Sequence, residues 1–212
     1  MFTASDSIAS VGVTAAPSVL STRLREHSHS DARRAFQAAR ETFIAGERID
    51  MGALAAALGV DRTSLFRWVG NRDALLSEVL WSLAEPTLAH ADRSTTELTG
   101  AARVAETLTR FVDDLNTAGY FRSFLQREPT RALRLLTTTE SQIQRRYVAT
   151  ATWLIERDLG PAPLGGAIDP TELAFLLVRL SESFTYSDLI AGEEPSAARA
   201  RVAFRLLLRA DV

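Results

Sequence analysis

Two arginines, a threonine and a phenylalanine share the outward face of one short predicted helix, over residues 61–68: Arg62, Thr63, Phe66 and Arg67. Guanidinium and hydroxyl groups form hydrogen bonds with base edges and phosphates, and an aromatic ring can touch a thymine methyl group. A short helix with such a face, braced by a preceding helix across a glycine turn, suits the major groove of DNA. The pattern therefore predicts a helix-turn-helix that reads DNA.

The elements that must position this face are a preceding helix and a tight turn. The preceding helix, over residues 50–58, carries one apolar stripe with i, i+3, i+4, i+7 spacing: Met51, Leu54, Ala55 and Leu58. Gly59 follows where a helix end needs positive φ, and Asp61 can cap the next helix. The inward face of that next helix is formed by Leu65, Trp68 and Val69.

The residues that carry a family resemblance are Ala55, Gly59, Val60, Leu65, Phe66, Trp68, Val69, Asn71, Arg72 and Leu75. With them the chain resembles the TetR family of bacterial transcription regulators. Members usually read Gly-Val-Ser, two variable residues, Thr-Leu-Tyr-x-His-Phe, and soon afterwards Asn or Ser, Lys and Leu. This chain differs at Phe66, Trp68, Val69 and Arg72, which replace Tyr, His, Phe and Lys. Beyond residue 90 the resemblance rests on length and helical pattern.

The resemblance implies roles for the individual DNA-binding residues. Base contacts are implied for Arg62, Thr63 and Phe66, and phosphate contacts for Ser64, Trp68 and Arg72; Arg67 completes the set. A helix N-terminus favours an anion and a guanidinium can clamp one, which agrees with Arg72 at the start of the next helix. Phe66 lacks a hydroxyl and cannot donate to a phosphate. Members often carry Thr and Arg where this chain has residues 50–52, so Asp50 is interpreted as a helix cap.

The composition excludes several classes of protein. Among 212 residues, 46% are hydrophobic and 24% charged, the net charge is −2, and cysteine is absent. No run approaches the roughly 18 consecutive apolar residues that a membrane span requires, and the first residues do not resemble a secretion signal. We therefore expect a cytoplasmic protein that binds no membrane and has neither disulfides nor thiolate metal sites.

Enzymatic activity is the first competing interpretation. The chain has three histidines and lacks a Gly-rich phosphate loop, an HExxH motif and a nucleophile elbow. Asp113 and Asp114 are adjacent on a predicted helix, where side chains diverge by about 100°, so they cannot converge on one metal ion. We expect no enzymatic activity, no metal and no cofactor.

The chain is predicted to be all-α, with about nine helices in a three-helix DNA-binding head and a larger helical body. Residues 1–28 are interpreted as a flexible arm, 29–76 as the helix-turn-helix domain, and 77–212 as an effector-binding and dimerisation domain. Predicted helices cover 31–45, 50–58, 61–68, 71 to about Pro86, 94–118, 129–159, 169–191 and 196–210, with a short aromatic segment at 120–125. Asn71 is predicted to cap the helix that links head and body. A capping box at 94–97 and Asp169 before Pro170 predict two of the helix starts.

The last two long helices are the candidates for a homodimer interface. One helix-turn-helix contacts few base pairs, and such proteins commonly place two recognition helices about 34 Å apart. One helix carries the stripe Leu173, Leu176, Leu177, Leu180 and Phe184, and the other carries Ala198, Val202, Arg205, Leu206 and Arg209. Two such helices from each subunit would form a four-helix bundle, as the resemblance also implies. Periodicity alone leaves open that both stripes fill the core of one subunit.

The resemblance further implies a small-molecule pocket inside the helical body. Its candidate residues are Phe111, Leu115, Tyr120, Phe121, Phe124, Tyr147, Thr150, Trp153, Phe175, Arg179, Ser183 and Phe184, most of which are better explained as core. Arg179 stands within an otherwise apolar run. We favour an i, i+3 pair with Glu182 or a contact across the dimer over an anchor for a ligand carbonyl or carboxylate.

These observations predict a ligand-responsive repressor that binds a near-palindromic double-stranded operator as a dimer. A mostly apolar effector would shift the helix after the helix-turn-helix and release the DNA, with a coupling of about 1–3 kcal/mol. The alternative is a helical interaction or architectural protein whose helix-turn-helix no longer reads sequence. The substitution at Phe66 and the residues at 50–52 are the grounds for that alternative.

Overall fold

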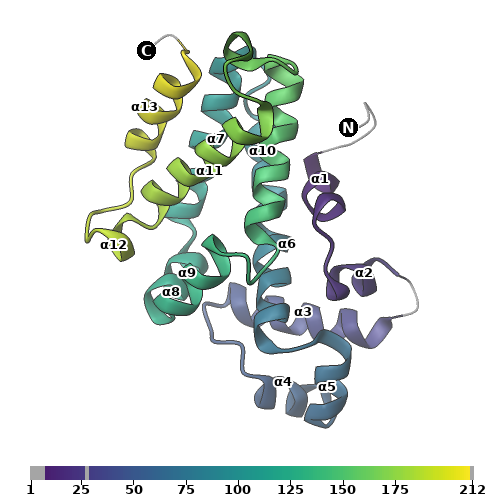
Figure 1. Ribbon diagram of the computed structural model, residues 1–212. Coiled ribbons are helices and arrows are strands. Elements are labelled where there is room, and N and C mark those ends of the chain that lie inside the picture. The colour runs from purple at the N-terminus through teal and green to yellow at the C-terminus, as the bar shows by residue number, and fades with distance from the viewer. Residues whose placement is uncertain (1–7, 27–28, 211–212) are drawn as a thin grey trace. The chain divides into compact units, whose positions relative to one another are not determined.

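The computed structural model describes residues 8–26 and 29–210, which form thirteen α-helices and one 3-10 helix without any strand (Figure 1). The all-α prediction is therefore confirmed. The helices are α1 (Ile8–Ala15), α2 (Val19–Arg25), α3 (Ser30–Ile44), α4 (Met51–Leu58), α5 (Arg62–Val69), α6 (Arg72–Arg93), α7 (Gly100–Thr117), α8 (Gly119–Arg127), α9 (Pro129–Thr137), α10 (Ile143–Leu159), the 3-10 helix (Pro163–Gly166), α11 (Pro170–Thr185), α12 (Ser187–Ile190) and α13 (Ala197–Leu208).

Two of the additional helices lie in the segment that we expect to be a flexible arm. Residues 1–7 and 27–28 lie outside the described part, but α1 and α2 are helical. α2 begins with a reciprocal cap: the Ser18 hydroxyl accepts from the Ser21 backbone N–H (2.9 Å), and the Ser21 hydroxyl accepts from the Ser18 backbone N–H (2.8 Å). A serine replaces the usual Glu or Gln at the third helical position, so the sequence signal is weak.

The single helix predicted over 129–159 is wrong, because the chain breaks between α9 and α10. The Ser141 hydroxyl donates to the Leu135 carbonyl oxygen (2.5 Å) and accepts from the Ile143 backbone N–H (3.1 Å). Side-chain hydroxyls therefore take the place of helical backbone partners. The helix predicted over 169–191 similarly divides into α11 and the short α12.

The predicted helix start at residues 94–97 is also wrong. α6 continues past Pro86 to Arg93, and the Ser94 and Thr95 hydroxyls donate to the Ala91 carbonyl oxygen at its end (2.8 and 3.2 Å). α7 begins only at Gly100. Proline removes one backbone hydrogen bond inside α6, yet Leu88 is 1% exposed, and burial of this turn favours continuation of the helix.

The chain divides into two compact units. The head unit consists of residues 16–83 and 119–144, and the body unit consists of the described residues up to Ala15, then 84–118 and 145–210. Residues 119–144 are predicted to belong to the effector-binding domain, whereas in the structure they pack with the helix-turn-helix. α6 runs through the boundary between the units.

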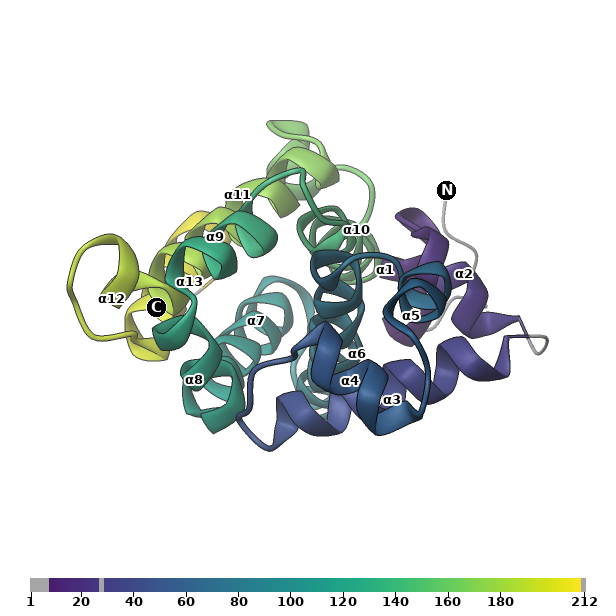
Figure 2. The same cartoon turned by 90° about the horizontal axis from the view of Figure 1, so that it is seen from below.

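The head core is built around α3, whose inward residues contact both the helix-turn-helix and α8. Figure 2 shows α3, α4 and α5 side by side, and each pair of them is in contact. Phe43 is 2% exposed and meets Tyr120 and Phe124 edge to face, with ring centroids 5.8 and 5.6 Å apart. This aromatic cluster ties residues 119–127 to the first helix of the DNA-binding motif.

The body core is formed where α7, α11 and α13 pack against one another. Leu108, Leu173, Leu177 and Phe204 are each 0% exposed there. Apolar residues that recur every three or four positions give each helix one inward face. The polar positions of α7 and α13 meet at the rim, where Arg201 lies 3.3 Å from Glu106.

Candidate nucleic-acid interface

Caps predicted from the sequence fix both helices of the helix-turn-helix. Asp50 accepts from two backbone N–H groups of α4, each at 2.8 Å, and Asp61 accepts from the Ser64 backbone N–H at 2.9 Å. The backbone N–H of Ala53 is the main cause that lowers the pKa of Asp50, and that of Ser64 lowers the pKa of Asp61. Gly59 ends α4 with φ of 69°. These predicted caps are confirmed.

The outer face of α5 carries the predicted polar and basic residues. Arg62, Thr63 and Arg67 are exposed, and Phe66 keeps 40% of its surface accessible. Leu65, at 0%, faces the core. The helix therefore presents two guanidinium groups, one hydroxyl and one ring on a single exposed surface.

Ser64 and Trp68, for which phosphate contacts are predicted, are half-buried on the flanks of α5. The Ser64 hydroxyl donates to the second carboxylate oxygen of Asp61 at 2.8 Å and lies 3.5 Å from a nitrogen of Arg67. A phosphate contact from Ser64 requires its hydroxyl to leave the carboxylate, whereas its backbone N–H serves the helix cap.

Arg72, for which a phosphate contact is predicted, is held by an ion pair inside the head unit. Its two terminal nitrogens donate to the two carboxylate oxygens of Glu128, both at 2.6 Å, and its Nε donates to the Ile49 carbonyl oxygen. The side chains of Arg72 and Glu128 are 14% and 12% exposed. Every nitrogen of the Arg72 guanidinium thus has a partner inside the head unit, and its contact with a phosphate stays a prediction.

An ion-pair network extends from this pair along α9. Arg131 lies 3.2 Å from Glu128 and also contacts Asp73 at the start of α6. Arg134 joins Asp73 (2.7 Å) to Glu140 (2.8 Å). The Arg72 side chain is the principal cause that holds the pKa of Glu128 below its ordinary value. Glu128 is not among the residues predicted from the sequence, and no local pattern marks it, because its partner lies 56 positions earlier.

The predicted effector residues fall into different units. Tyr120, Phe121 and Phe124 belong to the head unit, where Phe124 is packed on Phe43. In the body unit, Phe111, Tyr147 and Thr150 are buried, Leu115, Trp153, Arg179 and Phe184 are half-buried, and Phe175 and Ser183 are exposed. Phe175, with 44% of its surface accessible, does not line the interior of the body unit.

Arg179 pairs with Glu182, as their spacing predicts. Its Nη1 donates to a Glu182 carboxylate oxygen at 2.8 Å, and its guanidinium lies 5.1 Å from the centre of the Phe175 ring. Burial is the main influence on Glu182, and it raises the pKa of this carboxyl to about 7, although Arg179 acts in the opposite direction. The pair is thus ionised only near and above neutral pH.

Asn116 and Tyr147 are among the polar side chains of the body unit that have buried atoms without a protein hydrogen-bond partner. Their atoms are the amide nitrogen and oxygen of Asn116 and the hydroxyl of Tyr147. The neighbouring Ser181 hydroxyl donates to the Val178 carbonyl oxygen instead (2.8 Å), and burial raises the pKa of Tyr147, so its hydroxyl stays neutral. A buried polar atom without a partner costs about 1–3 kcal/mol, which favours any molecule that supplies one.

Residues 99–209 match the family described as "Tetracyclin repressor-like, C-terminal domain". The chain belongs to the TetR family of transcriptional regulators. The R. erythropolis transcriptional repressor QsdR, also a TetR-family protein, has a similar solved structure with a TM-score of 0.76 and 28% sequence identity, covering 84% of this chain and 94% of QsdR. A search among curated proteins finds no match.

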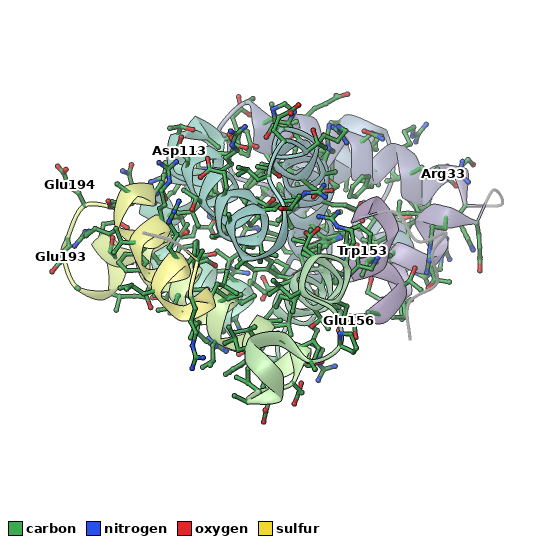
Figure 3. All side chains as sticks on the ribbon, turned by 90° about the horizontal axis from the view of Figure 1, so that it is seen from above. Arg33, Asp113, Trp153, Glu156, Glu193 and Glu194 are labelled. Carbon is green, nitrogen blue, oxygen red and sulfur yellow. The ribbon has the colours of Figure 1, made fainter. Side chains whose placement is uncertain are left out.

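Membership of the TetR family, whose members are regulators rather than enzymes, confirms that this chain is not an enzyme. Asp113, one of the two adjacent aspartates considered for a metal site, is exposed and points away from the helices (Figure 3). Across residues 8–26 and 29–210, no three His, Cys, Asp or Glu side chains gather as a metal would require. None of the described helices is both long and apolar enough to cross a membrane.

The raised pKa of Glu182 predicts a pH-dependent stability of this TetR regulator. Between pH 4.5 and 7 the unfolded carboxyl ionises while the folded one stays protonated, so the free energy of unfolding falls by about 2–3 kcal/mol as pH rises. Glu182→Gln should remove this slope in urea titrations between pH 4.5 and 8. Glu172→Gln, at an exposed position of α11, should keep it. An unchanged slope in Glu182→Gln would contradict the assignment.

Proposed function

We propose that this TetR-family chain is a ligand-responsive transcriptional repressor that binds a near-palindromic operator as a homodimer. The observation that carries the proposal is the exposed face of α5, where Arg62, Thr63, Phe66 and Arg67 stand together on a helix capped at its start and buried on its other side. The similarity to the repressor QsdR supports the direction of regulation.

Arg62, Thr63 and Phe66 are the residues that read base edges in this proposal. Arg62 lies at the first turn of α5, which is the end of a recognition helix that enters the major groove. Its guanidinium suits the two acceptors of a guanine, and the exposed Phe66 ring suits a thymine methyl group. Arg67, Trp68 and the Ser64 hydroxyl are left for phosphates. Arg72 is assigned to the head's internal ion pair instead.

The homodimer is proposed to form through the outer faces of α11 and α13. These helices pack against each other, and each leaves large apolar side chains exposed: Phe175 and Leu176 at 44% and 41%, and Val202 and Leu206 at 51% and 63%. Leu173 and Leu177, from the same predicted stripe, are 0% exposed and fill the core instead. The exposed residues would form the apolar centre of a four-helix interface.

The effector is proposed to be a mostly apolar small molecule with a few polar groups, bound in the body unit. Phe111 and Tyr147 supply an edge-to-face aromatic pair with centroids 5.2 Å apart. The unpartnered Asn116 amide offers both a donor and an acceptor, and the Tyr147 hydroxyl offers a donor. Asn116 is not among the effector residues predicted from the sequence.

The proposal is tested by fluorescence anisotropy on duplexes that tile the DNA upstream of the chain's own gene, with random duplex as competitor. Nanomolar binding confined to one near-palindromic tile is the expected result. Equal binding to random DNA would instead favour the architectural alternative. Once the operator is known, release of the labelled tile becomes the assay for the effector.

Arg62→Ala should relax discrimination at one base position of each half-site. The binding free energy for the preferred operator should weaken by about 1–3 kcal/mol. Operators that already carry a different base at that position should show a smaller loss. Binding to a set of operators with single base changes measures this. Arg48→Ala, an exposed arginine outside α5, is the charge-matched control and should leave base preference unchanged. A uniform loss across all operators would show that Arg62 contacts the backbone only.

A further inference from the structure

The Arg23 side chain of helix α2 contacts the recognition helix α5. Nη1 of Arg23 donates to the carbonyl oxygens of Arg67 and Trp68, at 2.6 and 3.0 Å. These carbonyls lie in the last turn of α5, where a helix has no further backbone N–H groups to satisfy them. A guanidinium there supplies hydrogen bonds and a positive charge at the negative end of the helix. Arg23 therefore acts as a C-terminal cap from outside the helix.

α2 is itself held in place by specific contacts with the head unit. Leu20 is 4% exposed, and the helix packs against α3. The Ser18 hydroxyl donates to a carboxylate oxygen of Glu78 at 2.6 Å, and Glu78 is 6% exposed on α6. α2 is thus fastened to α3, α5 and α6, which are the helices that position the DNA-reading face.

Arg23 lies beside two surface hollows. It lines a hollow of about 460 Å³ with residues of α6 and the α9–α10 connection, and a second hollow of about 260 Å³ with Asp31, Arg67 and Trp68. Beside these hollows, the two hydrogen bonds of Arg23 join α2 to the end of α5.

We propose that Arg23 is a positioning residue for sequence reading, which sets the end of the recognition helix without contacting DNA. This inference rests on the proposed operator binding. Base recognition depends on strict bidentate geometry, whereas a phosphate contact tolerates small displacements. Loss of the cap should therefore lower specific binding more than non-specific binding.

The test compares Arg23→Ala with Arg25→Ala, a control that removes the same charge from an exposed position of the same helix. Arg23→Ala should weaken operator binding about tenfold, with random-DNA binding and the salt dependence unchanged. Arg25→Ala should leave the ratio of specific to non-specific binding unaltered. Arg23→Lys keeps the charge but not the planar fork, and should fall between parent and alanine variant.

Hydrogen exchange on the free protein provides a readout that does not depend on DNA. In Arg23→Ala, amides at the end of α5, from residues 66–70, should exchange at least several-fold faster, while those of α13 stay unchanged. An equal loss on operator and random DNA, with a salt slope lower by about one unit, would show that Arg23 contacts a phosphate. Unchanged exchange in α5 would also overturn the proposal. If the parent protein reads no operator but exchange does rise, the proposed function fails and the cap remains.

Discussion

Arg72→Ala is expected to lower the free energy of unfolding by about 3 kcal/mol, because it leaves the Glu128 carboxylate in a site where that side chain is 12% exposed. Arg131 remains 3.2 Å from Glu128 and still compensates part of its charge. The expected loss of stability is therefore at the lower end of the range for removing one partner of a buried ion pair. Urea unfolding of the intact protein at pH 7 measures the effect. Arg72→Ala with Glu128→Leu should recover part of the loss, since no unpaired charge is then buried.

The matched control is Arg48→Ala, because Arg48 also faces Glu128 but at 3.9 Å and with 59% of its side chain exposed. A surface pair of this kind contributes about 0–1 kcal/mol.

The pH dependence of unfolding provides a second check. Arg72 holds the pKa of Glu128 below 4.5. The difference in free energy of unfolding between parent and Arg72→Ala should therefore be largest above pH 4.5 and should shrink as pH falls.

The same variant separates the two roles considered for Arg72. If Arg72 contacted a phosphate, Arg72→Ala would reduce the salt slope of DNA binding by about one unit. With the guanidinium committed to Glu128 and the Ile49 carbonyl, we expect an unchanged slope in the folded variant. A reduced slope without loss of stability would restore the phosphate role.

Leu206→Glu is expected to convert the homodimer into monomers and to weaken operator binding at least about 100-fold. Leu206 is 63% exposed on α13, so a charge there is tolerated by a folded monomer but is buried in the proposed interface. The DNA effect follows because each half-site then binds alone, without the effective concentration that a linked second site provides. Sedimentation velocity across micromolar concentrations, followed by anisotropy on the operator, measures both.

Leu98→Glu is the control, since Leu98 is 38% exposed but lies outside α11 and α13. It should remain dimeric and bind the operator like the parent. Circular dichroism of Leu206→Glu should show unchanged helix content. A Leu206→Glu protein that is still dimeric would place the interface elsewhere on the chain.

Features of the fold that depend on neighbouring residues could be predicted from the sequence. Asp50, Gly59, Asp61 and Asn71 act within a few positions of themselves, and each cap forms as predicted. The face of α5 follows from the same local periodicity. Its roles toward DNA remain predictions, because they depend on a partner that the chain alone does not contain.

Features that depend on distant partners could not be predicted. Nothing near Arg72 in sequence announces Glu128, and a lysine or arginine at that position looks the same whether it meets a phosphate or a carboxylate. The serine pattern at 94–97 matches a capping box, but those hydroxyl groups serve the end of α6. Phe124 is a residue type that often lines ligand pockets, and yet it packs on Phe43, because aromatic side chains suit both settings.

The discontinuous head unit has a consequence for building chimeric regulators. A graft of residues 16–83 onto another sensor would leave Arg72 and Asp73 without Glu128, Arg131 and Arg134, and would uncover Phe43. The exchangeable piece is instead the pair of segments 16–83 and 119–144, with crossovers at residues 83, 118 and 144. Recombination in the laboratory should therefore transfer operator choice only when both segments come from the same parent.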